Sequence, residues 1–250
     1  MAIDYKRSIT HENYGEAQLG LQKYYHKIDK QIHEMPRDLT NEKVKKKGVF
    51  IHADNNYLVF ESAAIAIPLW GGGMALFSIL CFIIFLEEWD ITSIVLNTIA
   101  MLILLFFIIY YFTMPKKEYI LNRKDGLITF SGLYWQPNIT MHFDNAIFTY
   151  STGGEDGTGA YRLEVIRPTK GLTFASFYAG GDCFYSISLI TWYMDKNRPL
   201  PPGDAFDKYR QRDFERRKAA GFPKPLYFSK VPTPEATPEQ QDERKRIGGW

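Results

Sequence analysis

Residues 63–113 read AAIAIPLWGGGMALFSILCFIIFLEEWDITSIVLNTIAMLILLFFIIYYFT, and this stretch decides the fold. Only EEWD, residues 87–90, separates two long blocks that hold no charged residue. A helix needs about 20 apolar residues to cross a hydrocarbon layer roughly 30 Å thick, and each block is long enough. The helix pair of a soluble core would normally keep a polar face, which neither block has. The sequence therefore predicts transmembrane helices at 64–86 and 91–113.

The charges on either side of these blocks predict an orientation. Ten Lys or Arg precede the first block, Lys116 and Lys117 follow the second, and the loop 87–90 holds three acids and no base. By the positive-inside rule, both termini are expected in the cytoplasm and the loop outside. The first ten residues lack the apolar core of a signal peptide, so insertion is expected to rely on the internal helices.

Small and polar residues within the spans suggest how the two helices meet. Gly71, Gly72 and Gly73 would allow close backbone approach, or would instead loosen the helix near Pro68. Asn97 is a strongly polar residue of the second span and is expected to bond across the helices, or to line a path. Spans without an ionisable residue argue against a transporter or proton channel.

Residues 114–200 change to the pattern of short strands. EYILNRKDGLITFSGLYW reads as a hairpin turning at Asp125-Gly126, and about six antiparallel strands follow one another in this region. GDCFYSISLITWYMDKN then predicts an amphipathic helix. The expected fold is α+β, with a half-barrel that the helix closes, similar to the pleckstrin-homology-like architecture. Residues 48–63 could add a strand or a hairpin, which would make the transmembrane helices an insertion into one soluble domain.

The two ends of the chain have different patterns. Within residues 1–47, apolar residues recur every three or four positions and predict an amphipathic helix from Gly15 to Met35, packed on its own domain or else on the membrane. Residues 201–222 predict a basic helix whose charged face is solvated or else meets anionic lipid. The Pro-rich, charged tail 223–250 is expected to be disordered.

No motif for catalysis or for a cofactor is present. The five histidines are scattered, the chain has no CxxC pair, and GGEDGTG at 153–159 lacks the Gly-Lys-Ser/Thr of a phosphate-binding loop. A disulfide between Cys81 and Cys183 is not expected. Residues 114–250 carry 20 bases against 16 acids without a dominant basic stripe, which argues against nucleic acid. We expect a protein that is not an enzyme and needs no metal or cofactor.

Two segments carry a resemblance to a known family. The segment YILNRKDGLITF follows the spans, and SISLITWYMDKNRPLPP comes near residue 200. With the two adjacent spans, they make residues 60–205 similar to a poorly characterised family of bacterial two-span membrane proteins, often encoded beside type VI secretion effectors and Rhs or PAAR-type toxins. The residues that carry the likeness are Asn122, Arg123, Lys124, Gly126, Trp192, Tyr193, Met194, Pro199, Leu200 and Pro201.

The resemblance implies a non-catalytic binding protein of the bacterial inner membrane. Its partners would be membrane lipid and a protein, either a toxin or a secretion component, so that it acts as an immunity or accessory factor. The loops expected to bind protein are Tyr134-Trp135 and the segment from Gly153 to Gly159. The alternative is a membrane-anchored scaffold or lipid-sensing module unrelated to toxins. The family offers no catalytic residue that could be carried over.

Overall fold

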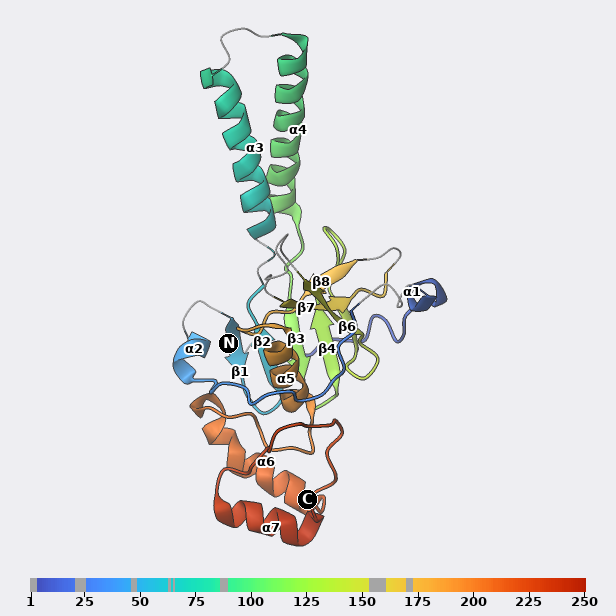
Figure 1. Ribbon diagram of the computed structural model, residues 1–250, viewed down its shortest axis with the longest axis vertical. Helices are drawn as coiled ribbons and strands as arrows, with labels where there is room; N and C mark the ends of the chain where they lie inside the picture. The colour runs from blue at the N-terminus through green and yellow to red at the C-terminus, as the bar shows by residue number, and fades with distance from the viewer. Residues whose placement is uncertain are drawn as a thin grey trace. The chain divides into compact units, whose positions relative to one another are not determined.

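The computed structural model divides the chain into two compact units (Figure 1). The structure describes residues 4–20, 26–45, 49–62, 64, 66–85, 90–152, 161–169 and 173–250. Unit 1 comprises Met1–Glu61, Glu118–Ser131 and Asn138–Trp250, and unit 2 comprises Ser62–Lys117 and Gly132–Pro137. Neither unit is a continuous stretch of chain.

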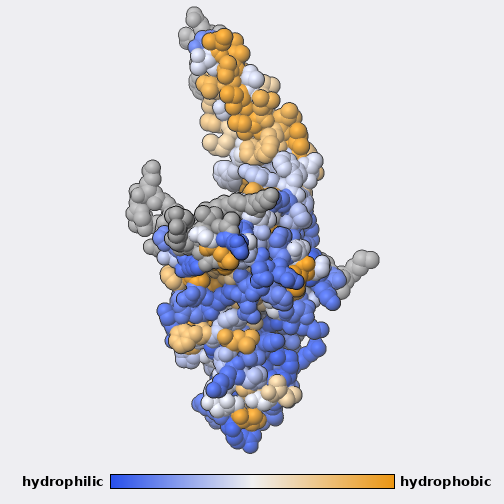
Figure 2. Space-filling view, turned by 90° about the vertical axis from the view of Figure 1, so that its right-hand side faces the viewer, coloured by the Kyte–Doolittle hydropathy of each residue, from blue (hydrophilic) through white to orange (hydrophobic). Residues whose placement is uncertain are grey.

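Unit 2 contains the two apolar helices, α3 (Ala66–Phe85) and α4 (Ile91–Thr113). At 20 and 23 residues they are about 30 and 35 Å long, enough to cross a hydrocarbon layer. The Asp90 side chain caps α4 by accepting the Ser93 N–H at 2.8 Å. Only 11% of the most apolar window of each helix is buried, and Figure 2 shows hydrophobic residues over the visible surface of the helix pair. Helices of a soluble core would be mostly buried, so the prediction of two helices that could span a membrane holds at the level of length, composition and exposure.

Unit 1 contains two antiparallel sheets. The first has the order β1-β2-β3-β4-β5 and the second the order β6-β7-β8. The strands of the first sheet are β1 (Phe50–Ala53), β2 (Tyr57–Phe60), β3 (Tyr119–Asn122), β4 (Leu127–Phe130) and β5 (Ile139–His142). The strands of the second are β6 (Phe148–Thr152), β7 (Tyr161–Ile166) and β8 (Phe174–Ser176). The described strands form no closed barrel, but the predicted α+β class with antiparallel strands is confirmed.

The apolar helices interrupt the first sheet. Strand β2 ends just before them and β3 begins just after them, yet the two strands pair in register, with Phe60 opposite Tyr119. Asp54 fixes the turn before β2 by accepting the N–H groups of Asn56 and Tyr57, each at 2.6 Å. Residues 48–63 therefore contribute a hairpin, β1–β2, to the domain that continues after the second apolar helix.

Helix α5 (Cys183–Met194) completes the core of unit 1. Asp182 caps it by accepting the Tyr185 N–H at 2.9 Å. The helix packs against β3 and β7, one strand from each sheet (Figure 1). Most of its side chains are buried, so it is more enclosed than an amphipathic surface helix. Fully buried residues from all three layers are Leu58, Leu121, Ile128, Phe130, Met141, Val165, Phe177, Ile187, Ile190 and Tyr193.

The predicted helix from Gly15 to Met35 is wrong over its second half. Helix α1 covers only Glu16–Gly20, residues 21–25 lie outside the described residues, and a second short helix, α2, covers Asn41–Lys45. Residues 26–35 are not helical: they form an antiparallel bridge from Lys27 to Thr149 and a parallel bridge from Ile32 to Ser229, with a bend between the two. Ile28 and Ile32, four residues apart, fit a helical pattern, but the Gln31 N–H donates to the Asp29 carbonyl and turns the chain between them. Backbone hydrogen bonds of Ile28 to β6 and of Ile32 to the residues on either side of Ser229 hold the segment in this non-helical form.

The C-terminal region is folded, contrary to the expected disorder of residues 223–250. A short 3₁₀ helix, η3 (Asp204–Phe206), leads into α6 (Asp207–Ala219), which is the predicted basic helix. After an irregular segment, α7 (Pro238–Gly248) begins at the Thr237 cap and ends at Gly249, whose φ of 72° suits glycine. The composition of the tail is that of a disordered segment, but in the folded chain Glu235 forms ion pairs with Arg217 and Arg244.

Candidate functional site: a groove over a buried ion network

Helix α6 presents two charged residues to the interior of unit 1. Asp213 and Arg217 are one turn apart and each side chain is only 1% exposed. The Arg217 Nε donates to Asp213 Oδ2 at 2.9 Å, and the Arg123 Nη1, from the β3–β4 turn, donates to Asp213 Oδ1 at 2.7 Å. The expected solvated face of this helix is therefore partly buried, because each inward charge meets an opposite one.

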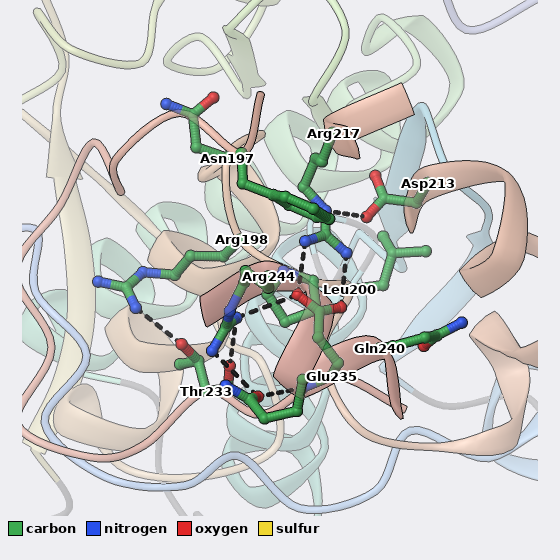
Figure 3. A network of polar contacts seen from close by, with 12 residues as sticks. Asn197, Arg198, Leu200, Asp213, Arg217, Thr233, Glu235, Gln240 and Arg244 are labelled. Carbon is green, nitrogen blue, oxygen red and sulfur yellow. Dashed lines mark hydrogen bonds and ion pairs between the residues drawn. The ribbon is translucent and has the colours of Figure 1, made fainter. Parts of the chain in front are cut away.

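Glu235 continues the network into the tail (Figure 3). Its carboxylate accepts both terminal nitrogens of Arg217, at 2.6 and 2.8 Å, in the bidentate arrangement that suits a guanidinium. It also accepts Arg244 Nη1 from α7 at 3.1 Å. The irregular segment between α6 and α7 is thereby fixed at Glu235, which is itself 2% exposed at the side chain.

The pairing keeps the network charged despite its burial. Burial by itself raises the pKa of Asp213, but the charges of Arg123 and Arg217 outweigh it and hold that pKa below its usual value. For Arg217, burial lowers the pKa, while the hydrogen bond to Glu235 and the charge of Asp213 raise it above its usual value. Such a network is costly to break at one member, since the remaining charge is left buried and unpaired.

A second pair holds the segment that follows α6. The Arg198 Nε donates to Asp195 Oδ2 at 3.0 Å, its Nη1 donates to Thr233 Oγ1 at 2.7 Å, and its Nη2 donates to the Tyr227 carbonyl at 2.7 Å. Asp195 also accepts the backbone N–H of Leu226 at 3.0 Å. These bonds fix both ends of residues 226–233 on the end of α5, so the segment is shaped rather than loose.

Above this base lies a groove of about 780 Å³. Its lining consists of Arg198, Lys224, Pro225, Leu226, Tyr227, Phe228, Ser229, Val231, Pro232, Thr233, Pro234, Gln241, Arg244, Lys245 and Trp250. This C-terminal groove has apolar and cationic walls, and no acidic residue is among its described lining. Leu226 and Phe228 are 52% and 66% exposed, although such large side chains are usually covered.

The two arginines that line the C-terminal groove form ion pairs with acids, whereas its lysines form none with the described residues. Asp195 and Glu235 beneath its floor offset Arg198 and Arg244, whereas the exposed Lys224 and Lys245 form no ion pair with the described residues. The Arg244 guanidinium lies 4.1 Å from the centre of the Trp250 ring, a cation–π contact. Its Nε is buried without a hydrogen-bond partner in the described part of the chain. The groove therefore suits an occupant with acidic and apolar groups.

Of the two loops predicted to bind protein, the structure describes only Tyr134-Trp135. Tyr134 and Trp135 belong to unit 2, where their rings pack against Tyr110 of α4. The segment from Gly153 to Gly159 lies outside the described residues. Tyr134 and Trp135 are not among the described residues that line the C-terminal groove.

The residues predicted to pack the apolar helices against each other differ in how closely they contact the other helix. A Cβ on Gly71 would come within 2.3 Å of the Phe107 ring, so the α4 side chain occupies the space that the missing Cβ leaves. At Gly72 the nearest atom is at 3.6 Å, and at Gly73 nothing lies within 4 Å. The buried Oδ1 of Asn97 has no hydrogen-bond partner in the described residues, so the structure gives no bond from it to α3.

Sequence reasoning missed the C-terminal groove because its signals resemble those of a flexible tail. Prolines at 225, 232 and 234 and the alternating charges of α7 are frequent in disordered segments. The one local hint was PLYFS, residues 225–229, in which three large apolar side chains stand within a charged region. Pairing of Arg217 with Glu235 depends on the tertiary fold and has no sequence period.

Several titratable groups of unit 1 are engaged in structural contacts. Among the residues that the structure describes, no group of three His, Cys, Asp or Glu side chains could hold a metal ion. Burial raises the pKa of Cys183 to about 11, which disfavours the thiolate that a nucleophile needs. The buried carboxylates of Asp195, Asp213 and Glu235 accept hydrogen bonds from arginines. Each of these three carboxylates therefore has a structural partner.

The fold and the groove together define a class: an α+β protein in which two apolar helices interrupt an antiparallel sheet, with a cationic and apolar groove built by its C-terminal region. No family model, no curated protein and no solved structure matches the chain. Function has to be inferred from the site, since a fold alone does not define one.

Proposed function

We propose that the protein is a membrane-anchored, non-catalytic binding protein whose C-terminal groove takes a segment of a protein partner. The observation that carries the proposal is the groove itself, an exposed apolar surface held on a rigid ion network. The resemblance to two-span proteins encoded beside type VI secretion effectors adds the setting. In that setting the protein is an immunity or accessory factor of the bacterial inner membrane, and the partner is a toxin or a secretion component.

The anchoring role is supported by unit 2. Its helices are long, apolar and barely buried, so lipid is the solvent that fits them. Pairing of β2 with β3 supports a topology in which both flanks of the helix pair lie on one side of the bilayer, because a ladder of hydrogen bonds joins them. The positive flanking charges favour the cytoplasm for that side.

The binding role is supported by the composition of the C-terminal groove. Aromatic and arginine side chains supply most of the binding energy in protein interfaces, and Tyr227, Phe228, Trp250 and Arg244 line this groove. Lys224 and Lys245, which form no ion pair with the residues that the structure describes, would attract an acidic partner surface and raise its association rate. The expected ligand is an acidic segment that carries at least one large apolar side chain.

The test combines rescue with binding. Cells carrying the full-length protein should survive expression of one toxin encoded nearby, and the detergent-solubilised chain should bind that toxin. Phe228→Ala and Lys224→Glu should each weaken binding by about tenfold or more, as truncating an interface anchor costs about 1–2 kcal/mol. Tyr178→Ala is the matched control, because Tyr178 is also exposed, at 58%, and lies outside the groove lining. Equal binding by all variants would reject the groove as the site, and absence of any rescue would reject the immunity role.

A second candidate is a lipid-sensing module of pleckstrin-homology-like architecture. The order of elements favours it, since antiparallel strands are followed by one core helix, α5. Vesicles with and without anionic lipid separate the candidates. A lipid sensor should bind the anionic vesicles through unit 1 in a chain that lacks the apolar helices, whereas a toxin-binding protein should require the toxin.

A further inference from the structure

The loop Gly132–Pro137 belongs to unit 2, although it connects two strands of unit 1, β4 and β5. We call it the aromatic loop, because Tyr134 and Trp135 are at its tip. The Trp135 Nε1 donates to Thr113 Oγ1, in the last turn of α4, at 2.7 Å. A connection between two soluble strands is therefore fastened to the end of an apolar helix.

The rings of the aromatic loop continue the contact along α4. The Trp135 ring lies 5.0 Å from Tyr110 and 5.6 Å from Phe106 between ring centroids, in edge-to-face geometry. The Tyr134 ring lies 5.8 Å from Tyr110. Phe106 is seven residues before the end of α4, so the contact reaches about 10 Å along the helix axis. The two rings thus lie beside the last two turns of the apolar helix.

Buried contacts hold the aromatic loop in this place. Lys117, 7% exposed, donates from Nζ to the carbonyls of Gly132 and Gln136, at 2.9 and 2.8 Å, and so closes the loop across its base. A Cβ on Gly132 would meet the Pro137 carbonyl at 2.1 Å, so only glycine fits there. Tyr134 has a φ of 43°, a left-handed conformation that a residue with a bulky side chain rarely adopts. A strained tyrosine that persists is a sign that its placement has a use.

The outer faces of the two rings are not covered by protein. Tyr134 and Trp135 are 48% and 43% exposed in spite of their contacts with α4. The helix surface next to them is apolar and also exposed, with Ile109 at 49% and Phe112 at 79%. Rings with an apolar body and a polar tip prefer the boundary between lipid headgroups and acyl chains. The surface that lipid would cover on α4 is continuous with the one that the loop presents.

We propose that the aromatic loop is a membrane-interface anchor, in which Tyr134 and Trp135 insert beside the C-terminal end of α4 and contact lipid. The inference rests on the proposed membrane location of the helix pair. It assigns these two rings to lipid in place of the protein partner that the sequence suggested. The soluble sheet then contributes a third point of membrane contact, in addition to the two spans.

Photocrosslinking of the full-length chain in native membranes tests this directly. Benzoylphenylalanine replaces Tyr134, with the same substitution at Ile103 in the span and at Phe228 in the C-terminal groove as references. Mass spectrometry of the adducts should find lipid at Tyr134 and Ile103 and none at Phe228. Protein adducts at Tyr134, or no lipid adduct there while Ile103 gives one, would overturn the anchor. Loss of the lipid adduct at Ile103 as well would instead reject the membrane location itself.

A second variant pair links the result to the loop geometry. Lys117→Met removes the ammonium that closes the loop and should strongly reduce the lipid adducts at Tyr134 while those at Ile103 stay unchanged. Lys116→Met removes the same charge from the exposed neighbouring position and should leave both sites unchanged. Equal adducts at Tyr134 in the two variants would show that Lys117 does not position the loop and would contradict the anchor as described.

Discussion

Arg217 lies between two carboxylates, Asp213 and Glu235, in a place with almost no access to water. Its position explains why a charged helix face can be buried: each acid accepts a charge-assisted hydrogen bond and neither stands alone. The sequence could not predict this, because the interleaved Arg and Asp residues of α6 have the pattern of a solvated helix. Only the partner at 235, distant in sequence, distinguishes a buried network from a solvated one.

Replacing Arg217 tests the network at its centre. Arg217→Met should lower the free energy of unfolding by about 3–5 kcal/mol, since it leaves two buried carboxylates without their cation. Arg212→Met is the control on the same helix, and because Arg212 is exposed its effect should stay within about 0.5 kcal/mol. Thermal unfolding of the full chain in detergent measures both. Equal melting temperatures for the two variants would mean that the network does not stabilise the fold.

Acid should weaken the same network. The pKa of Asp213 in the folded chain lies below its ordinary value, so its contribution to stability is full above about pH 4 and is lost as the pH falls through the folded pKa. We expect the melting temperature to fall as the pH is lowered below about 4. Asp213→Asn should be less stable at pH 7 and should show a shallower fall. An identical pH profile in the variant would assign the acid sensitivity to other groups.

Among the elements, both apolar helices and the strand hairpins were predictable, because each depends on local signals. A block of about 20 uncharged residues predicts an apolar helix, and a turn such as Asp125-Gly126 predicts a hairpin. Both signals are contained in a short stretch of sequence. The helix predicted over residues 26–35 was wrong because the apolar spacing there does not distinguish a helix from a non-helical chain. Hydrogen bonds to β6 and to residues near Ser229, which are distant in sequence, determine the structure. The C-terminal groove was missed for the same reason, since its floor is made by contacts distant in sequence.

The contact between α3 and α4 can be tested at neighbouring glycines. Gly71→Val should lower the stability of the helix pair by about 1–3 kcal/mol, because the new side chain meets the Phe107 ring. Gly73→Val is the matched control, since a Cβ there meets no atom within 4 Å. Unfolding of the full chain in lipid nanodiscs measures both variants. A larger loss at Gly73 than at Gly71 would contradict this packing.

Removal of the C-terminal region distinguishes a folded element from a disordered tail. Deleting residues 223–250 should expose α6 to hydrogen exchange, because Arg217 loses Glu235 and the helix loses α7 as a neighbour. A disordered tail would leave exchange in α6 unchanged. Glu235→Gln in the full-length chain is the milder comparison and should raise exchange in α6 to a smaller extent. If the protection of α6 from hydrogen exchange were unchanged after the deletion, the tail would behave as a disordered segment.

For the molecule as a whole, the decisive property is that protein buries little of the surface of the apolar helix pair. Ile103, 43% exposed near the middle of α4, tests whether lipid surrounds it. Ile103→Arg should reduce the membrane-integrated yield, because a charge at mid-span costs about 2.5–3.5 kcal/mol on insertion scales. Ile51→Arg is the control, an exposed isoleucine of β1, and should not change the yield. Equal yields for the two arginine variants would argue against a lipid-facing α4.

The pairing of β2 with β3 also imposes an order on biogenesis. A growing chain emerges with β1 and β2 first, then both apolar helices, and β3 only afterwards. A hairpin of two strands is only marginally stable in water. The edge of β2 that pairs with β3 therefore stays open until both apolar helices and β3 have been synthesised. Pairing of β3 with β2 therefore follows the synthesis of both apolar helices. A molecule whose helices fail to insert would keep the edge of β2 unpaired, and an open strand edge favours aggregation.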